Sequence, residues 1–275
     1  MPTDRTLMLH GQRVHYVEWG QASAPAVIML HGITGHARTW DEECRLLAGR
    51  YRAIALDQRG HGDTDPALDG DYSDDALLGD LVAFADALGL RRLSLVALSL
   101  GGRVAINFAG RHPDRVERMI IIDIGPEIAP VGRARVGTLM ATAPERFATR
   151  DEVFAHMRAN APLYSDALLR QRAEHAVRPL PDGGFTWKYD RALRDAIRQG
   201  RLRVPGDLWP QWRAITCPTL LVRGELSDLL TDEMAKRMMD EQPAARLVVV
   251  PGAGHTVPGD QPAAFQSLLR EFLMS

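Results

Sequence analysis

The sequence predicts an α/β protein in which helices flank a mostly parallel central sheet, and three observations lead to this fold class. Short apolar runs rich in β-branched residues alternate with segments of helical periodicity from residue 26 to residue 126. The same alternation resumes at residue 218 and continues to the end of the sequence. Between these parts the strand pattern disappears, and helical, arginine-rich segments replace it. Such alternation is typical of a parallel sheet covered by helices, here with a helical insertion.

The expected elements follow one another in a simple order. Two strands, near residues 7–10 and 14–19, are expected to form an antiparallel edge. The apolar runs AVIMLHG (26–32), RAIALDQRG (52–60) and LSLVALSLGG (93–102) are each followed by a helix, at 40–47, 75–89 and 103–112, before the strand RMIIIDIGP (118–126). The last part contains PTLLVRGELSD (218–228), a helix at 232–239, ARLVVVPGAGH (245–255) and a closing helix at 263–273.

This order predicts a three-part organisation. Residues 1–128 and 211–275 form the two parts of the core, and residues 129–210 form a helical cap. The cap contains 14 Arg and Lys against 9 Asp and Glu, a net charge of +5, whereas the whole chain has −2. A positive cap could favour anionic substrates, although most of its arginines are expected to lie on the outer faces of helices.

Composition narrows the class of partner. With 33 basic and 35 acidic residues, the chain has no charge excess that favours nucleic acid or an anionic membrane, so a small molecule is the expected partner. The first 20 residues lack the apolar core of a signal peptide, and no apolar run approaches the roughly 18 residues of a membrane span, which predicts a soluble, cytoplasmic protein. Cys44 and Cys217 have no metal-ligand spacing, so packing is their expected role and no metal or cofactor is predicted. The oligomeric state stays open.

The segment LSLVALSLGGRVAINFAG carries the strongest functional signal. An apolar strand leads directly into Ser99, two glycines and a helix. A serine exposed on a sharp turn between strand and helix needs small neighbours, which Ala97, Gly101 and Gly102 provide. The usual form of this nucleophile elbow is G-x-S-x-G, and Ala97 replaces its first glycine.

Together with four further motifs, this elbow resembles the α/β-hydrolase fold family, in particular its capped, esterase-like and lipase-like serine hydrolases. HGITG follows the third strand, DQRGHGDTD the fourth and the elbow the fifth. RGELSD and PGAGHT occupy the positions of the family's acid and histidine, and the order serine, acid, histidine is that of the family. The resemblance covers nearly the whole length of the chain.

The resemblance implies a catalytic triad of Ser99, His255 and an aspartate. His255 would accept the serine proton and return it to the leaving group. Asp228, in the loop RGELSD, is the favoured acid, since relatives more commonly carry it after that strand. Asp123, at the end of RMIIID, is the alternative, because relatives also place the acid there.

The resemblance also assigns supporting residues. The N–H groups of Ile33 and Leu100 would form the oxyanion hole that stabilises the negative oxygen of the intermediate. In DQRGHGDTD, Asp57, Arg59 and His61 are expected to bond to backbone groups and not to a metal. Aromatic residues in and just after the cap could line an apolar substrate pocket or simply join cap and core; these are Trp187, Tyr189, Trp209 and Trp212.

The predicted reaction is hydrolysis of a carboxylic ester or lactone through an acyl-enzyme, with water as second substrate. Two alternatives stay open: cleavage of a carbon–carbon bond next to a ketone by the same triad, and a ligand-binding receptor on a hydrolase scaffold. An epoxide hydrolase or a haloalkane dehalogenase is disfavoured, because those relatives carry an aspartate where this chain has Ser99.

Overall fold

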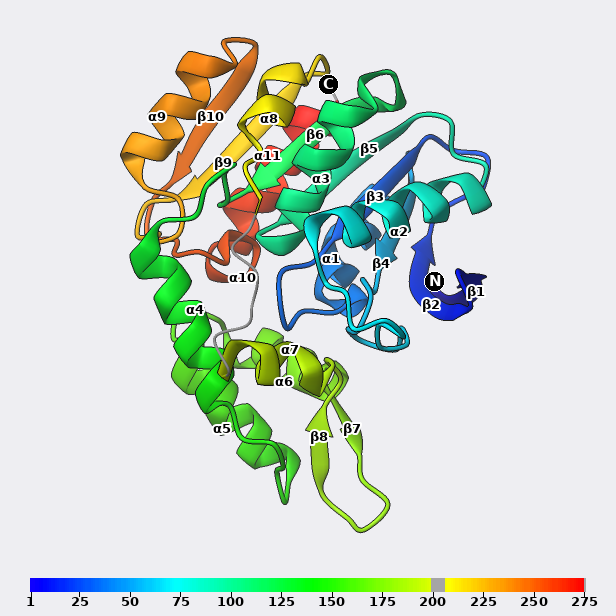
Figure 1. Ribbon diagram of the computed structural model, residues 1–275, viewed down its shortest axis with the longest axis vertical. Coiled ribbons are helices and arrows are strands. Elements are labelled where there is room, and N and C mark those ends of the chain that lie inside the picture. The colour runs from blue at the N-terminus through cyan, green and yellow to red at the C-terminus, as the bar shows by residue number, and fades with distance from the viewer. Residues whose placement is uncertain (199–205, 275) are drawn as a thin grey trace.

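An eight-stranded sheet forms the centre of the computed structural model, which describes residues 1–198 and 206–274 (Figure 1). Its strand order is β1-β2-β4-β3-β5-β6-β9-β10. The β1–β2 and β2–β4 pairs are antiparallel, and every other neighbouring pair is parallel. The predicted mostly parallel sheet with an antiparallel edge is therefore confirmed. The strands are β1 (Thr3–Leu9), β2 (Gln12–Trp19), β3 (Ala26–Leu30), β4 (Arg52–Leu56), β5 (Leu93–Leu98), β6 (Val116–Ile122), β9 (Thr219–Gly224) and β10 (Ala245–Val250).

Helices cover both faces of this sheet. On one face lie α2 (Asp74–Ala87), α3 (Leu100–Arg111), α8 (Trp209–Ala214) and α9 (Asp232–Glu241). On the other lie α1 (Asp41–Leu47) and α11 (Pro262–Met274). Short helices at η1 (Ala37–Trp40), η2 (Pro113–Arg115) and α10 (Val257–Asp260) lie in the connections.

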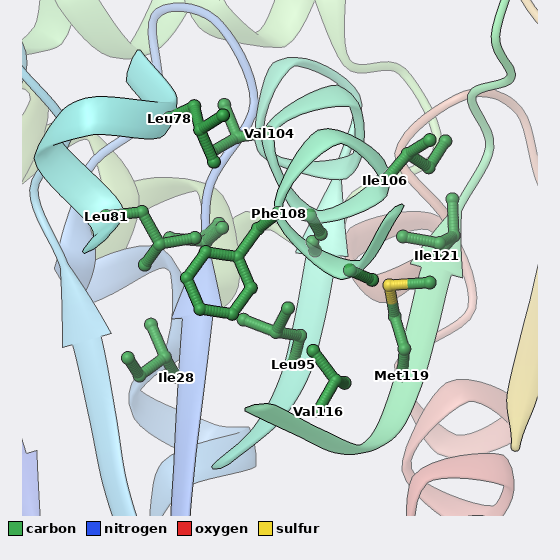
Figure 2. Close-up of a cluster of buried hydrophobic side chains, with 14 of the residues drawn as sticks. Ile28, Leu78, Leu81, Leu95, Val104, Ile106, Phe108, Val116, Met119 and Ile121 are labelled. Atoms are coloured by element: carbon green, nitrogen blue, oxygen red, sulfur yellow. The ribbon is translucent and has the colours of Figure 1, made fainter. Parts of the chain in front are cut away.

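Burial on both faces explains why the central strand β3 is apolar at every position. In β3, Ile28 and Leu30 contribute to the core beneath α2 and α3, whereas Val27 and Met29 contribute to the core beneath α1 and α11. All four side chains are fully buried, as expected for a parallel strand with helices on both sides. Figure 2 shows the first of these cores, with Phe108 of α3 at its centre among side chains from α2 and the strands.

The predicted insertion lies between β6 and β9. It contains α4 (Pro130–Thr142), α5 (Arg150–Asn160), α6 (Asp166–Ala176), the hairpin β7 (Val177–Pro179) and β8 (Phe185–Trp187), and α7 (Arg191–Arg198). In Figure 1 this inserted segment, residues 130–198, forms a separate group below the sheet. A small apolar cluster of its own, including Met140, Phe147, Val153 and Trp187, holds it together.

The far end of the predicted cap differs from expectation. Residues 199–205 lie outside the described residues, and α8, which contains Pro210, packs against α3 and contributes to the main core. Cys44 and Cys217 are buried and form no disulfide. Across residues 1–198 and 206–274, the helices are too short or too polar to cross a membrane.

Candidate active site

Ser99 lies at the junction between β5 and α3 in a conformation that few non-glycine residues adopt. Its φ is 53° and its ψ is −114°. A Cβ at Gly101 would lie 2.5 Å from the Leu30 oxygen, and a Cβ at Gly102 would lie 2.4 Å from Ile124 Cγ2. Both glycines are therefore required for α3 to start so close to the sheet. The turn directs Ser99 into a cavity, as predicted from the elbow.

His255 follows β10, and its ring is fixed by a buried carboxylate. Nδ1 of His255 lies 2.8 Å from Oδ2 of Asp123, whose side chain is fully buried. Because an ionised carboxylate only accepts hydrogen bonds, this contact assigns the proton of a neutral His255 to Nδ1. Nε2 is then left as the basic nitrogen. Ser99 and His255 line the same cavity.

Asp123 is oriented by the ends of two neighbouring strands. It follows β6 with φ at 51°, another left-handed conformation of a non-glycine residue. Oδ1 accepts the N–H of Gly224 at 2.8 Å, and Oδ2 accepts the hydroxyl of Ser227 as well as His255 Nδ1. Donors on both oxygens replace the hydrogen bonds to water that this fully buried carboxylate has lost.

The preference for Asp228 as the partner of His255 is wrong. Asp228 lies in the loop after β9, but Arg135 of α4 binds its carboxylate with two hydrogen bonds, of 2.6 and 2.8 Å. The hydrogen bond from Arg135 lowers the pKa of Asp228. Asp123, the alternative acid, occupies the position against His255 because β6 lies beside β9 in the sheet and ends at the same edge.

Ser227 is a member of this arrangement that the sequence did not reveal. It immediately precedes Asp228, and its hydroxyl donates to Asp123 while accepting the N–H groups of Leu229 and Leu230 at 3.2 and 3.3 Å. Nothing in RGELSD distinguishes a serine that orients the acid from an ordinary loop serine. Only the contact across the sheet identifies it.

The predicted oxyanion donors lie on two loops beside Ser99. The Leu100 N–H is the first of α3, where no intrahelical acceptor exists. Ile33 belongs to a turn closed by the Gly35 N–H on the Gly32 oxygen at 2.9 Å, and a Cβ at Gly32 would lie 3.2 Å from Ser99 Cβ. Within residues 1–198 and 206–274, neither the Ile33 nor the Leu100 N–H has an acceptor in the protein. Both are available to bind a developing negative charge.

The cavity that holds these groups has a volume of about 470 Å³ and lies between the sheet edge and the inserted segment. Its size is that of a small-molecule site. Trp187 and Tyr189 line it, which is one of the two roles considered for the aromatic residues of the cap. Trp209 and Trp212 do not: they are buried in the main core, where their indole N–H groups bond to Glu127 and to the Met238 oxygen. The prediction is wrong for these two residues because α8 packs on α3.

The loop after β4 is organised by buried polar side chains. His61 Nδ1 lies 2.9 Å from the Arg59 oxygen, and Arg59 binds the Asp71 oxygen and the carboxylate of Asp80. Burial alone would raise the pKa of Asp57, but the hydrogen bond from His15 and neighbouring charges lower it to about 2. The expectation that Asp57, Arg59 and His61 bond to backbone groups is confirmed, and Arg59 in addition binds Asp80 of α2.

One trio in the described residues has metal-ligand types within reach of one another: His15, Asp57 and Asp63, whose ligand atoms lie within 4.8 Å. These atoms already bind one another and the protein. His15 Nδ1 contacts Asp57 at 2.7 Å, Asp57 accepts the Asp63 N–H at 2.9 Å, and Lys188 donates to Asp63 at 2.7 Å. These hydrogen bonds explain why the three side chains lie close together.

Comparison with known proteins gives a consistent result. A family model described as alpha/beta hydrolase fold matches residues 25–262. A putative 2-succinyl-6-hydroxy-2,4-cyclohexadiene-1-carboxylate synthase of Bacillus subtilis is 30% identical to this chain, and the match covers 100% of both chains. An esterase of Mycobacterium tuberculosis is 32% identical, over 94% of this chain and 85% of its own. The crystal structure of E-2-(acetamidomethylene)succinate hydrolase is 28% identical, with a TM-score of 0.92 over 100% of both chains.

Proposed function

The chain belongs to the alpha/beta hydrolase fold family, and from this premise we propose that it hydrolyses a carboxylic ester or lactone through an acyl-enzyme formed on Ser99. One observation carries the proposal. Ser99, on its left-handed turn, lines the same cavity as His255, whose Nδ1 is bound to the buried Asp123. A nucleophile, a base and a carboxylate that fixes the tautomer of the base are the parts that acyl transfer requires.

In the first half of the proposed reaction, Nε2 of His255 accepts the proton of Ser99 as the serine oxygen attacks the carbonyl carbon. The carbonyl oxygen gains a negative charge, which the N–H groups of Ile33 and Leu100 stabilise. Asp123 stabilises the imidazolium without accepting its proton. The intermediate collapses when the carbon–oxygen bond to the alcohol breaks, and His255 protonates the departing oxygen.

In the second half, water replaces the alcohol. His255 accepts a proton from the water as the water oxygen attacks the acyl carbon. A second tetrahedral intermediate forms, and the same N–H groups stabilise its negative oxygen. Its collapse breaks the bond to Ser99, and His255 returns the proton to the serine. The products are a carboxylic acid and an alcohol, or a hydroxy acid when the substrate is a lactone.

The inserted segment serves as the cap in this proposal. Its residues Met140, Met157 and Leu169 line the cavity with Trp187 and Tyr189, which gives the substrate an apolar wall opposite Ser99 and His255. An apolar wall excludes water from the bound ester and strengthens the hydrogen bonds made by the oxyanion donors.

A substrate panel tests the proposal. The panel contains 4-nitrophenyl esters of two to eight carbons, a γ-lactone and a vinylogous diketone. We expect many turnovers on at least one ester or lactone and a loss of roughly 10³-fold or more in kcat for Ser99→Ala. Cleavage of the diketone alone would instead identify a carbon–carbon bond hydrolase. Release of no more than one equivalent of product from every compound would indicate a receptor.

A further inference from the structure

Arg172 is a buried cation inside the cavity. It belongs to α6 of the inserted segment, its residue is 9% exposed, and it lines the cavity together with Ser99 and His255. Most arginines of the inserted segment lie on the surface, as expected for helices that face water. Arg172 points inward, so it requires a separate explanation.

The guanidinium of Arg172 has few partners in the protein. Nη1 donates to the Tyr164 hydroxyl at 2.6 Å, and the guanidinium carbon lies 4.7 Å from the centre of the Tyr164 ring. Nε is buried without an acceptor. Among residues 1–198 and 206–274, no carboxylate lies within 4.0 Å of the guanidinium.

Four other arginines in the described part of the chain are buried, and two of them, Arg103 and Arg194, also have a buried Nε without an acceptor. Their terminal nitrogens, however, bind stronger acceptors than a phenol oxygen. Arg103 binds Asp74 at 2.8 Å and the carbonyl oxygens of Pro126 and Gly206. Arg194 donates to the oxygens of Ala143 and Pro144. Neither residue lines the cavity. Burying an arginine therefore normally brings a carboxylate or carbonyl oxygens to it in this fold, and Arg172 has only a phenol oxygen.

The acidic groups that interact with Arg172 compensate its charge incompletely. Glu43 and Asp260 interact with it through their charges but form no ion pair with it. Burial raises the pKa of Asp260 and raises that of Glu43 to about 7. The Asp260 oxygens already accept the Gly254 N–H at 3.0 Å and the Thr256 hydroxyl at 3.3 Å.

The rest of the cavity indicates the charge of the missing partner. The charge of Arg135 is matched by Asp228. Burial lowers the pKa of His36 to about 3 and also lowers that of His156, so both rings are neutral near pH 7. Arg172 is then the one cation lining the described cavity without a carboxylate bound to it. Asp260 also lines the cavity, but its oxygens bind Gly254 and Thr256 and form no ion pair with Arg172. The single unpaired guanidinium therefore favours a carboxylate over a phosphate dianion.

We propose that Arg172 and the hydroxyl of Tyr164 bind a free carboxylate of the substrate, so that the natural substrate is an ester or lactone that also carries an acid group. This proposal rests on the proposed hydrolase function and adds the substrate class to it. The Tyr164 hydroxyl accepts from Arg172 and donates to no acceptor among residues 1–198 and 206–274, so its own hydrogen can bind the substrate carboxylate. The planar guanidinium offers further N–H groups, and the resulting hydrogen bonds orient the scissile carbonyl toward Ser99.

A pair of substrates of equal shape tests the proposal: the mono-4-nitrophenyl ester of adipic acid and the corresponding adipamate ester, in which an amide replaces the carboxylate. We expect Arg172→Met to lower kcat/KM for the acidic ester roughly 30-fold or more, and for the neutral ester less than about threefold. Arg172→Lys should lie between. The matched control is Arg170→Met, on the exposed face of the same helix, which should change neither value. Equal losses on both esters would show that Arg172 only supports the fold and would overturn the proposal.

Binding of the product-like diacid gives a measurement independent of turnover. Adipate should raise the Tm of the wild-type protein and of Ser99→Ala, and should compete with the neutral ester. Adipic diamide and butylphosphonate should do both more weakly. Absence of any preference for adipate in the wild-type protein would refute the carboxylate site, even if Arg172→Met fails to fold. Failure of the hydrolase function would look different: adipate would bind, and no ester would be turned over.

Discussion

Oδ2 of the buried Asp123 lies 2.8 Å from Nδ1 of His255, across 132 positions of the sequence. The two residues follow β6 and β10, on either side of β9, and meet at the carboxyl edge of the sheet. This contact gives His255 a defined tautomer and a basic Nε2 in the cavity that Ser99 lines. The proposed chemistry depends on it.

Exchange of the carboxylate of Asp123 for an amide should therefore lower the rate of the reaction strongly. Asp123→Asn can offer its N–H₂ to His255 and hold the ring in the wrong tautomer, so we expect kcat to fall by roughly 10²-fold to 10⁴-fold. The measurement is kcat on the best 4-nitrophenyl ester of the panel, with circular dichroism to establish that the variant is folded.

Asp228→Asn is the matched control. It removes the same charge from a carboxylate that binds Arg135 and is one-third exposed. Such a pair contributes at most about 1 kcal/mol to stability, and kcat should change less than about fivefold. A larger loss of kcat in Asp228→Asn than in Asp123→Asn would show that Asp228, in the loop after β9, is the acid of the triad.

Ser227 should affect the reaction through Asp123 alone. Ser227→Ala removes one donor from the carboxylate, and hydrogen bonds to charged groups contribute about 1.5–3 kcal/mol. We expect kcat to fall about tenfold with KM nearly unchanged, and the pH-rate profile to shift because the carboxylate is less well oriented. Ser267→Ala, on the exposed surface of α11, is the control. An unchanged pH profile together with a loss of Tm would show a structural role only.

Three buried histidines should make stability depend on pH. Burial lowers the pKa of His31 to about 4, and those of His36 and His61 to about 3. In the unfolded chain these histidines bind a proton near pH 6.5. The stability that their neutral, buried rings allow is therefore fully present above that pH and is lost as the pH falls toward 4. For each of these histidines, the free energy of unfolding should fall by roughly 2 kcal/mol between pH 7 and pH 5. His15, whose pKa is raised, acts in the opposite direction.

One substitution isolates this effect. Urea unfolding at pH 7 and pH 5 should show a smaller loss of free energy in His61→Gln than in the wild-type protein, by about the contribution of one histidine. His10→Asn replaces an exposed histidine and should leave the loss unchanged. An identical pH dependence in His61→Gln would mean that His61 does not resist protonation in the folded state.

The fold was predictable because its signals are local. An apolar run such as AVIML can be recognised as a strand buried on both faces without knowledge of its neighbours, and the turn at Ser99 requires small residues within a few positions. The choice between Asp123 and Asp228 is not local. Both follow a strand, and only the paths of two loops decide which carboxylate reaches His255.

The remaining site residues lacked a sequence signal for related reasons. Trp212 lies in the main core, where α8 packs against α3, whereas Trp187 lines the cavity, and the residues next to each tryptophan did not separate these two roles. Arg172 is one of many arginines in the inserted segment, and its inward direction follows from how α6 packs against the core. Ser227 is visible only through its contact with Asp123.

The most direct test of the account is covalent labelling of the nucleophile. A fluorophosphonate probe reacts with a serine only where a base removes its proton and donors stabilise the negative oxygen. We predict one probe per chain, located by mass spectrometry on Ser99, and strongly slowed labelling in His255→Ala. Absence of labelling in the active wild-type protein, or labelling that persists in Ser99→Ala, would contradict the account.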